Sequence, residues 1–141
     1  MSVIFPALAG RSHFPVRFSG IYFCRSDEKA RFHLPLNIKR SLADRTFFLS
    51  ILQNQEKVLI LIETQIWRKS IKAMPRLERP SFTAFSFQGK LDRQGRFVID
   101  ANLRKLTGLA AGDEIVIAGC GNHLQIMKKS AWEASLDQPK T

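Results

Sequence analysis

The sequence has 141 residues and a formal net charge of +10, from 22 Lys and Arg against 12 Asp and Glu. This length suits one ordinary domain or two half-sized units, and an apolar content of 45% excludes a disordered chain. A domain this basic usually has a polyanionic partner, because binding phosphates releases condensed counterions; a solvated surface without a partner is the alternative.

Residues 1–17 predict an N-terminal extension of loose structure. Their apolar stretch, residues 3–9, is short, is interrupted by Pro6 and follows no basic residue, which argues against a secretory signal. No stretch of the sequence approaches the ~20 apolar residues that cross a bilayer. Cys24 and Cys120 are too far apart to indicate a disulfide framework or a zinc cluster. We therefore expect a cytoplasmic protein.

The chain contains two similar copies related by a shift of 65 residues. Under this shift identical residues coincide without a gap, among them Asp27 with Asp92, Arg31 with Arg96, Phe32 with Phe97 and Trp67 with Trp132. This constant spacing predicts two tandem units, residues 18–80 and 81–136, followed by a tail at 137–141. Each unit alone buries little apolar surface, so we expect the two units, and two or more chains, to share cores.

The first unit predicts short strands around one small helix. In chain order we expect a hairpin over residues 21–34 with a charged turn at 26–31, a helix after Pro35, strands around 47–52 and 58–62, a helix that Thr64 opens and Met74-Pro75 ends, and a basic linker over 76–80.

The second unit predicts the same order. We expect a hairpin of strands 85–91 and 96–99 around the turn Asp92–Gly95, a helix over 101–106 between Asp100 and Gly108, strands at 114–118 and 124–127, and a terminal helix opened by a capping box at Ser130–Glu133. Gly95 suits a positive φ, and Leu103 and Leu106 are expected to be buried.

The two charged turns carry a resemblance to a known family. Gly20 followed by Asp27 to Arg31 is similar to the first half of MraZ proteins, and Leu-Asp-Arg-Gln-Gly-Arg at 91–96 with the stretch that follows is similar to their second half. The resemblance covers residues 18–136. It implies a mainly β fold with short helices (α+β), in which two tandem AbrB-like swapped-hairpin units form a pseudo-symmetric barrel.

The resemblance also implies a function. MraZ proteins are transcriptional regulators, so we expect a repressor that binds double-stranded DNA at repeats upstream of the division and cell-wall gene cluster, including its own promoter. It implies a homo-oligomer, a ring, in the cytoplasm and nucleoid, with no cofactor, metal, membrane or small-molecule substrate. By motif, Arg31 and Arg96 are the expected DNA contacts, while Asp27, Asp92 and Gly95 organise the turns.

Further basic residues flank the turns. Arg25, Lys29, Lys90 and Arg93 are expected phosphate contacts without base specificity. Ala30 stands where the motif has glycine. If that position needs φ > 0, alanine costs about 1 kcal/mol or the turn changes shape. We therefore expect the second turn to present its arginine better.

The residues support DNA binding without the family, because a two-stranded ribbon fits the major groove and arginine can grip guanine or clamp phosphates. The alternative for each turn is a solvated Asp–Arg ion pair worth under ~1 kcal/mol. Two other functions stay open: a swapped-hairpin, antitoxin-like protein-interaction module and an RNA-binding protein.

Aromatic and polar residues give no sign of other chemistry. Phe32, Phe97, Trp67 and Trp132 are expected in the core or an interface rather than in a stacking platform for single strands. The sequence shows no nucleophile–base pair, glycine-rich phosphate cradle or carboxylate dyad, so we do not expect an enzyme.

Overall fold

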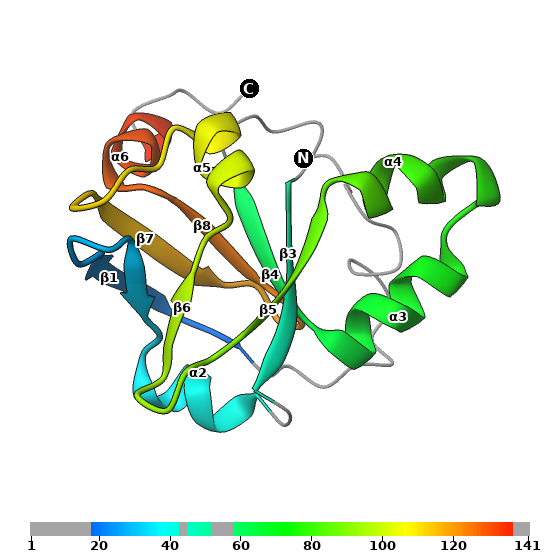
Figure 1. Ribbon diagram of the computed structural model, residues 1–141, viewed down its shortest axis with the longest axis horizontal. Helices are drawn as coiled ribbons and strands as arrows, with labels where there is room; N and C mark the ends of the chain where they lie inside the picture. The colour runs from blue at the N-terminus through cyan, green and yellow to red at the C-terminus, as the bar shows by residue number, and fades with distance from the viewer. Residues whose placement is uncertain (1–17, 43–44, 52–57, 137–141) are drawn as a thin grey trace.

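The computed structural model describes residues 18–42, 45–51 and 58–136 (Figure 1). The expected N-terminal extension and C-terminal tail lie outside the described residues. The elements are β1 (Ile21–Arg25), β2 (Arg31–His33), α2 (Leu36–Ser41), β3 (Thr46–Ile51), β4 (Leu59–Glu63), α3 (Thr64–Ala73), the 3-10 helix η1 (Arg76–Glu78), α4 (Arg79–Ala84), β5 (Ser86–Lys90), β6 (Arg96–Val98), α5 (Ala101–Thr107), β7 (Glu114–Gly119), β8 (Leu124–Lys128) and α6 (Lys129–Leu136).

The strands form one large sheet and one short ribbon. The sheet is antiparallel with the order β1-β7-β8-β4-β3-β5, and β2 pairs with β6 in the ribbon. The expected mainly β fold with short helices is therefore confirmed. Among the described strands β1 and β5 end the sheet without pairing to each other, so the sheet is not closed into a barrel.

The order of the strands is symmetric between the two halves of the chain. Exchanging β1 with β5, β3 with β7 and β4 with β8 reverses the sheet order and leaves it unchanged. The ribbon is symmetric as well, because Phe32 lies directly opposite Phe97. A pseudo-two-fold axis therefore passes through the ribbon at this pair and relates the two sequence copies.

The expected hairpins are wrong. β5 leads through the charged turn to β6, yet β5 pairs with β3 and β6 pairs with β2. In the same way β1 pairs with β7 of the other copy. An isolated hairpin would leave its apolar side chains in water, whereas the exchange covers both copies with one another. The pairs β3–β4 and β7–β8 form as the sequence predicts.

The shift of 65 residues does not hold along the whole repeat. It relates β2 to β6 and β4 to β8, but Thr46–Ile51 corresponds to Glu114–Gly119, a shift of 68. The register shows this, because Lys90 pairs with Thr46 where Arg25 pairs with Glu114. The second copy is three residues longer before this strand and three shorter after it, so an ungapped comparison misaligns the strand.

One apolar core lies between the sheet and the ribbon and draws on both copies, as expected. Its fully buried members include Phe32, Phe47, Phe97 and Ile99. The rings of Phe32 and Phe97 are 5.7 Å apart between centroids, and Phe47 meets Phe97 edge-on at 5.9 Å. These contacts attach the ribbon to the sheet.

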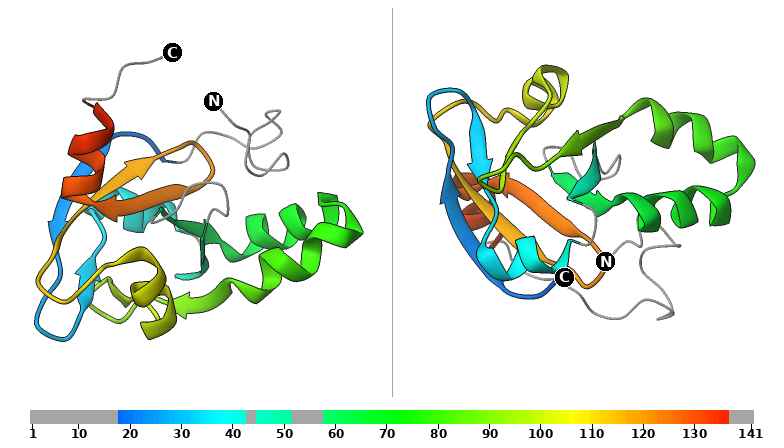
Figure 2. Two further views of the ribbon diagram at one scale, coloured as in Figure 1. Left: turned by 90° about the horizontal axis from the view of Figure 1, so that it is seen from above. Right: turned by 60° about the horizontal axis from the view of Figure 1, so that its bottom comes forward.

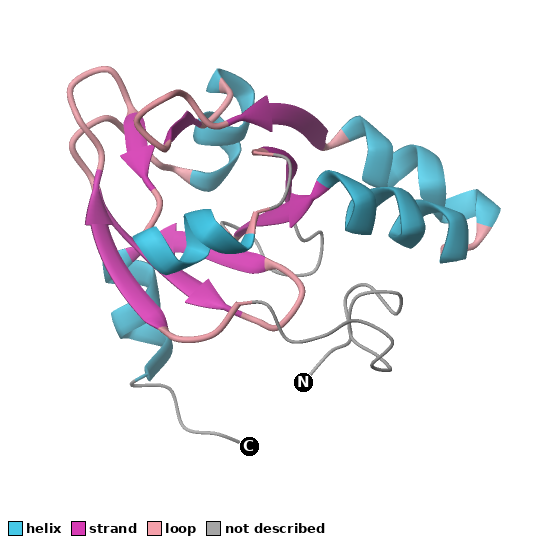
Figure 3. Cartoon of the chain, turned by 90° about the horizontal axis from the view of Figure 1, so that it is seen from below, coloured by secondary structure: helices cyan, strands magenta, loops and turns pink. Residues whose placement is uncertain are grey.

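A helical arm, α3 to α4, extends from one end of the molecule and makes the halves unequal (Figures 1 and 2). Figure 3 shows its helices side by side, apart from α2, α5 and α6. Trp67 of α3 stacks between Phe48 and Phe82 at 3.8 and 6.2 Å, whereas Trp132 of α6 meets only Phe23, edge-on at 5.5 Å. The tryptophans are thus packed as expected.

The helices correct three details of the prediction. Residues 76–80 are not a linker, because they belong to η1 and the start of α4. α6 already begins at Lys129, so Ser130 lies inside the helix and does not cap it. Leu106 is 53% exposed, since only one side of α5 faces the core. The Asp100 cap and the left-handed Gly108 are confirmed.

We expect Phe97→Ala to lower the free energy of unfolding by about 3–5 kcal/mol, because it empties a fully buried site on the pseudo-axis. Val98→Thr, at the next residue on the exposed side of the same strand, keeps the β-branched shape and should change it by less than about 0.5 kcal/mol. Urea denaturation measures both. Equal losses in the two variants would contradict the placement of Phe97 in the core.

Candidate nucleic-acid interface

The first charged turn is organised by one carboxylate. Asp27 Oδ1 accepts the backbone N–H groups of Lys29 and Arg31, both at 2.9 Å, and Oδ2 accepts Arg31 Nε at 2.6 Å. The backbone closes the turn, since Ala30 N donates to the Asp27 carbonyl at 3.0 Å. A single side chain therefore fixes both the path of the chain and the direction of the arginine.

The second turn repeats these bonds. Asp92 Oδ1 accepts the backbone N–H groups of Gln94 and Arg96 at 2.9 and 2.8 Å, and Oδ2 accepts Arg96 Nε at 2.7 Å. Gly95 N donates to the Asp92 carbonyl at 3.0 Å. The two turns thus have the same hydrogen-bond pattern.

The missing glycine of the first turn does not alter its shape. Ala30 has a φ of 59° and Gly95 a φ of 78°, so both lie in the left-handed region. Alanine pays for this conformation in strain rather than by changing the turn. The expectation that the first turn presents its arginine less well has no support in this geometry.

The carboxylates of both turns are held in their charged form. The pKa of Asp27 lies below its usual value, chiefly because its oxygen accepts the backbone N–H of Arg31. The pKa of Asp92 is lowered in the same way by the backbone N–H of Arg96. The ionised form of each acid is the one that organises its turn.

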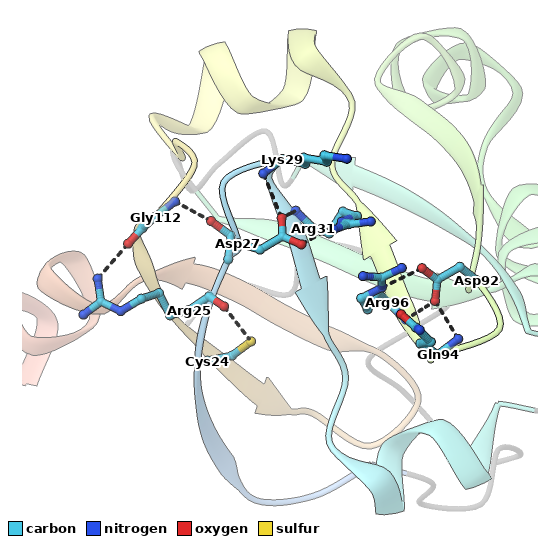
Figure 4. Close-up of polar contacts among 10 residues, drawn as sticks. Cys24, Arg25, Asp27, Lys29, Arg31, Asp92, Gln94, Arg96 and Gly112 are labelled. Carbon is cyan, nitrogen blue, oxygen red and sulfur yellow. Dashed lines mark hydrogen bonds and ion pairs between the residues drawn. The ribbon is translucent and has the colours of Figure 1, made fainter.

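The two arginines lie side by side at the pseudo-axis. Figure 4 shows Arg31 and Arg96 between the two turns, with Asp27 and Asp92 on the outer sides. Their side chains are 30% and 20% exposed. Each uses Nε on its own aspartate, and among the described residues neither has a recorded partner for its two terminal nitrogens. Four terminal nitrogens are therefore available to a ligand.

The ribbon strands determine which side chains share this face. Arg31 lies opposite Val98, and His33 lies opposite Arg96. Because side chains alternate along a strand, these residues face outward while the phenylalanines between them face the core. Sequence reasoning missed His33 and Val98, although their alternation with Phe32 and Phe97 was a usable signal.

The flanking basic residues differ in how they are held. The Arg25 side chain donates to the Gly112 carbonyl at 2.8 Å and forms an ion pair with Glu114 at 3.0 Å. Lys29 is exposed beside the first turn. Lys90 and Arg93 are exposed beside the second turn.

Lys90 and Arg93 line an open hollow together with Arg45. Arg45 comes from the other copy, has a φ of 57° and donates to the Asp92 carbonyl. Sequence reasoning missed it because only the exchange of strands brings β3 beside β5. The second turn is therefore supported, and made more basic, by the first copy.

The described residues contain no group of three or more His, Cys, Asp or Glu that could hold a metal ion. Over the same residues, no helix has both the length and the apolar character needed to cross a membrane.

Comparison with known proteins identifies the family. A family model described as "MraZ protein, putative antitoxin-like" matches residues 82–140. A protein of Dehalococcoides mccartyi named "Transcriptional regulator MraZ" is 34% identical over 127 residues, covering 83% of this chain and 86% of its own. Proteins of the same name from Syntrophomonas wolfei and Moorella thermoacetica are 30% and 29% identical, covering 82% of this chain and 83% and 84% of their own.

These matches extend over most of the chain and include both copies of the turn. The chain belongs to the MraZ family.

Asp27→Asn should destabilise the fold above about pH 4 and matter less below it. The carboxylate has a lowered pKa in the folded state, so its stabilisation is present above the unfolded value near 3.8 and is lost as the pH falls through the folded value. The measurement is the free energy of unfolding from pH 7 to pH 3.

Glu28→Gln in the same turn is the matched control, because Glu28 is exposed and has no recorded contact among the described residues. Its difference from the wild type should stay small at every pH. A difference for Asp27→Asn that does not shrink at low pH would contradict the role of the carboxylate.

Gly95→Ala should lower the free energy of unfolding by about 1 kcal/mol or more, because alanine is strained at this φ and its Cβ would overlap the Lys39 side chain. In Ala30→Gly, relief of strain is offset by the lost buried methyl and by unfolded-chain entropy, so we expect a change under about 0.5 kcal/mol. Thermal and urea unfolding of both variants test this contrast; an equal loss in the two would refute it.

Proposed function

We propose that this protein is a transcriptional regulator that binds double-stranded DNA through its two charged turns and the ribbon between them. The observation that carries the proposal is the pairing of Arg31 and Arg96 at the pseudo-axis, each oriented by its own aspartate with its terminal nitrogens open. The name of the relatives, transcriptional regulator, supports the same function.

The geometry suits a DNA groove. A two-stranded ribbon fits the major groove, where arginine recognises guanine O6 and N7 with two donors. The aspartates hold the Nε atoms at 2.6 and 2.7 Å, so the guanidinium groups are oriented before the ligand arrives. Both acids face backbone N–H groups, which spreads their negative charge into the turns and away from an incoming phosphate.

Phosphate contacts would surround this reading surface. Lys29 lies beside the first turn, and Lys90, Arg93 and Arg45 surround the second. Such contacts add affinity at any sequence and depend strongly on salt. Arg25 is the weaker candidate of the set, because its guanidinium already bonds Gly112 and Glu114.

The finer function follows the family. The proposed targets are repeats upstream of the division and cell-wall gene cluster, including the protein's own promoter, with repression as the outcome. The acting species is a ring-shaped homo-oligomer in the cytoplasm and nucleoid, whose weak contacts add up over spaced repeats. The protein requires no cofactor or small-molecule substrate and is not an enzyme.

Arg31→Ala and Arg96→Ala should each weaken binding to the duplex upstream of the protein's own gene by about tenfold or more, since a bidentate arginine–guanine contact is worth about 1–3 kcal/mol. Because the two turns are alike, we expect similar losses. Gel-shift titration at fixed salt measures them, and light scattering checks that the oligomer is intact.

Arg68→Ala is the charge-matched control, because Arg68 is exposed on α3 of the helical arm, away from the ribbon. It should bind nearly as the wild type does. Unchanged affinity in both ribbon variants would reject the turns as the DNA-binding surface. Preference for structured RNA over duplex DNA at the same salt, or co-purification of a stoichiometric protein partner without DNA binding, would favour the rival functions.

A further inference from the structure

The outward face of the ribbon consists of four residues around the pseudo-axis: Arg31, His33, Arg96 and Val98. Phe32 and Phe97 point the other way into the core. Arg31 and Arg96 are diagonal neighbours across the two strands, with Cα atoms about 7–8 Å apart in such pairs. His33 and Val98 occupy the other diagonal.

This face is symmetric in position but not in chemistry. The shift that relates the strands places His33 on Val98, just as it places Arg31 on Arg96. The arginines are identical and are held by identical turns, whereas an imidazole and an isopropyl group stand at the other two positions. The ribbon therefore carries two different pairs, Arg96 opposite His33 and Arg31 opposite Val98.

Both unlike residues are accessible. Val98 is 54% exposed, and His33 is exposed as well. One exposed valine is ordinary on a protein surface, so exposure alone carries no inference. Its position does, because a ligand that reaches the terminal nitrogens of both arginines must also pass over Val98 and His33.

These residues suit different base edges. A neutral imidazole offers one donor and one acceptor, which can bond base edges in the major groove. A valine offers only apolar contact, which in the major groove is available at the methyl group of thymine. Neither residue can replace the other as a reader.

We propose that His33 and Val98 are specificity-determining residues that make this protein read an asymmetric DNA sequence. The inference rests on the proposed function. The half-site under Arg31 has a thymine methyl against Val98, and the half-site under Arg96 has a hydrogen-bonding base edge against His33. A pseudo-symmetric protein thereby distinguishes the two directions of its operator.

Selection from a random duplex library tests the proposal, with the full-length wild type, His33→Val and Val98→His compared at one salt concentration. The wild type should enrich a motif with two unlike halves. Each variant carries the same residue at both positions, so each should enrich a motif with more similar halves, and the two variant motifs should differ. Thermal midpoint and oligomer size confirm that the variants are folded.

A second measurement isolates the methyl contact. Replacing thymine by deoxyuridine in the selected duplex should weaken wild-type binding about fourfold at one position, the value of one buried methyl group. Val98→Ser should bind the two duplexes equally. Arg68→Ala should respond to deoxyuridine as the wild type does.

The outcomes separate this inference from the proposed function. If all three proteins enrich the same motif while Arg31→Ala and Arg96→Ala still bind weakly, the turns bind DNA and the inference about His33 and Val98 is overturned. If no motif is enriched and the arginine variants bind as the wild type does, both the inference and the proposed function fail.

Discussion

The antiparallel pairing of β2 with β6 is the constraint on which the rest of the structure depends. Phe32 and Phe97 lie opposite each other at its centre and are buried against the sheet. Because side chains alternate along a strand, burying these two rings places Arg31 and Arg96 on the opposite face. The apolar core and the candidate DNA-binding surface are thus two sides of one three-residue ribbon, and neither can shift by a residue without destroying the other.

The aspartate of each turn adds the orientation that the ribbon lacks. A long arginine on a strand has many rotamers, and ordering it on binding costs free energy. Asp27 and Asp92 each bond two backbone N–H groups and the Nε atom of the arginine, so the turn and the guanidinium are fixed together. This explains why the same charged turn occurs twice, and the left-handed φ of 59° at Ala30 shows that its glycine can be replaced at the expense of strain.

The pseudo-symmetry is a frame on which the two halves differ. The helical arm covers Trp67 with Phe82, while Trp132 has only Phe23 as its aromatic neighbour among the described residues. The longer connection before β7 and the longer one after β3 cancel, so the copies stay in register where they meet. On the ribbon itself the difference is reduced to His33 and Val98, which is where a difference bears on recognition.

The sequence by itself determined the local features: the two charged turns, the Asp100 cap, the left-handed Gly108, most strand positions and the equivalence of the copies. These depend on bonds between residues near each other in the chain, so the residue types reveal them. The tertiary structure decided which strands pair, that residues 76–84 form helices, and that Arg45, His33 and Val98 join the site. A strand offers the same backbone donors and acceptors to any partner, and the choice between a local hairpin and an exchanged pair is made by the apolar area that the whole chain can bury.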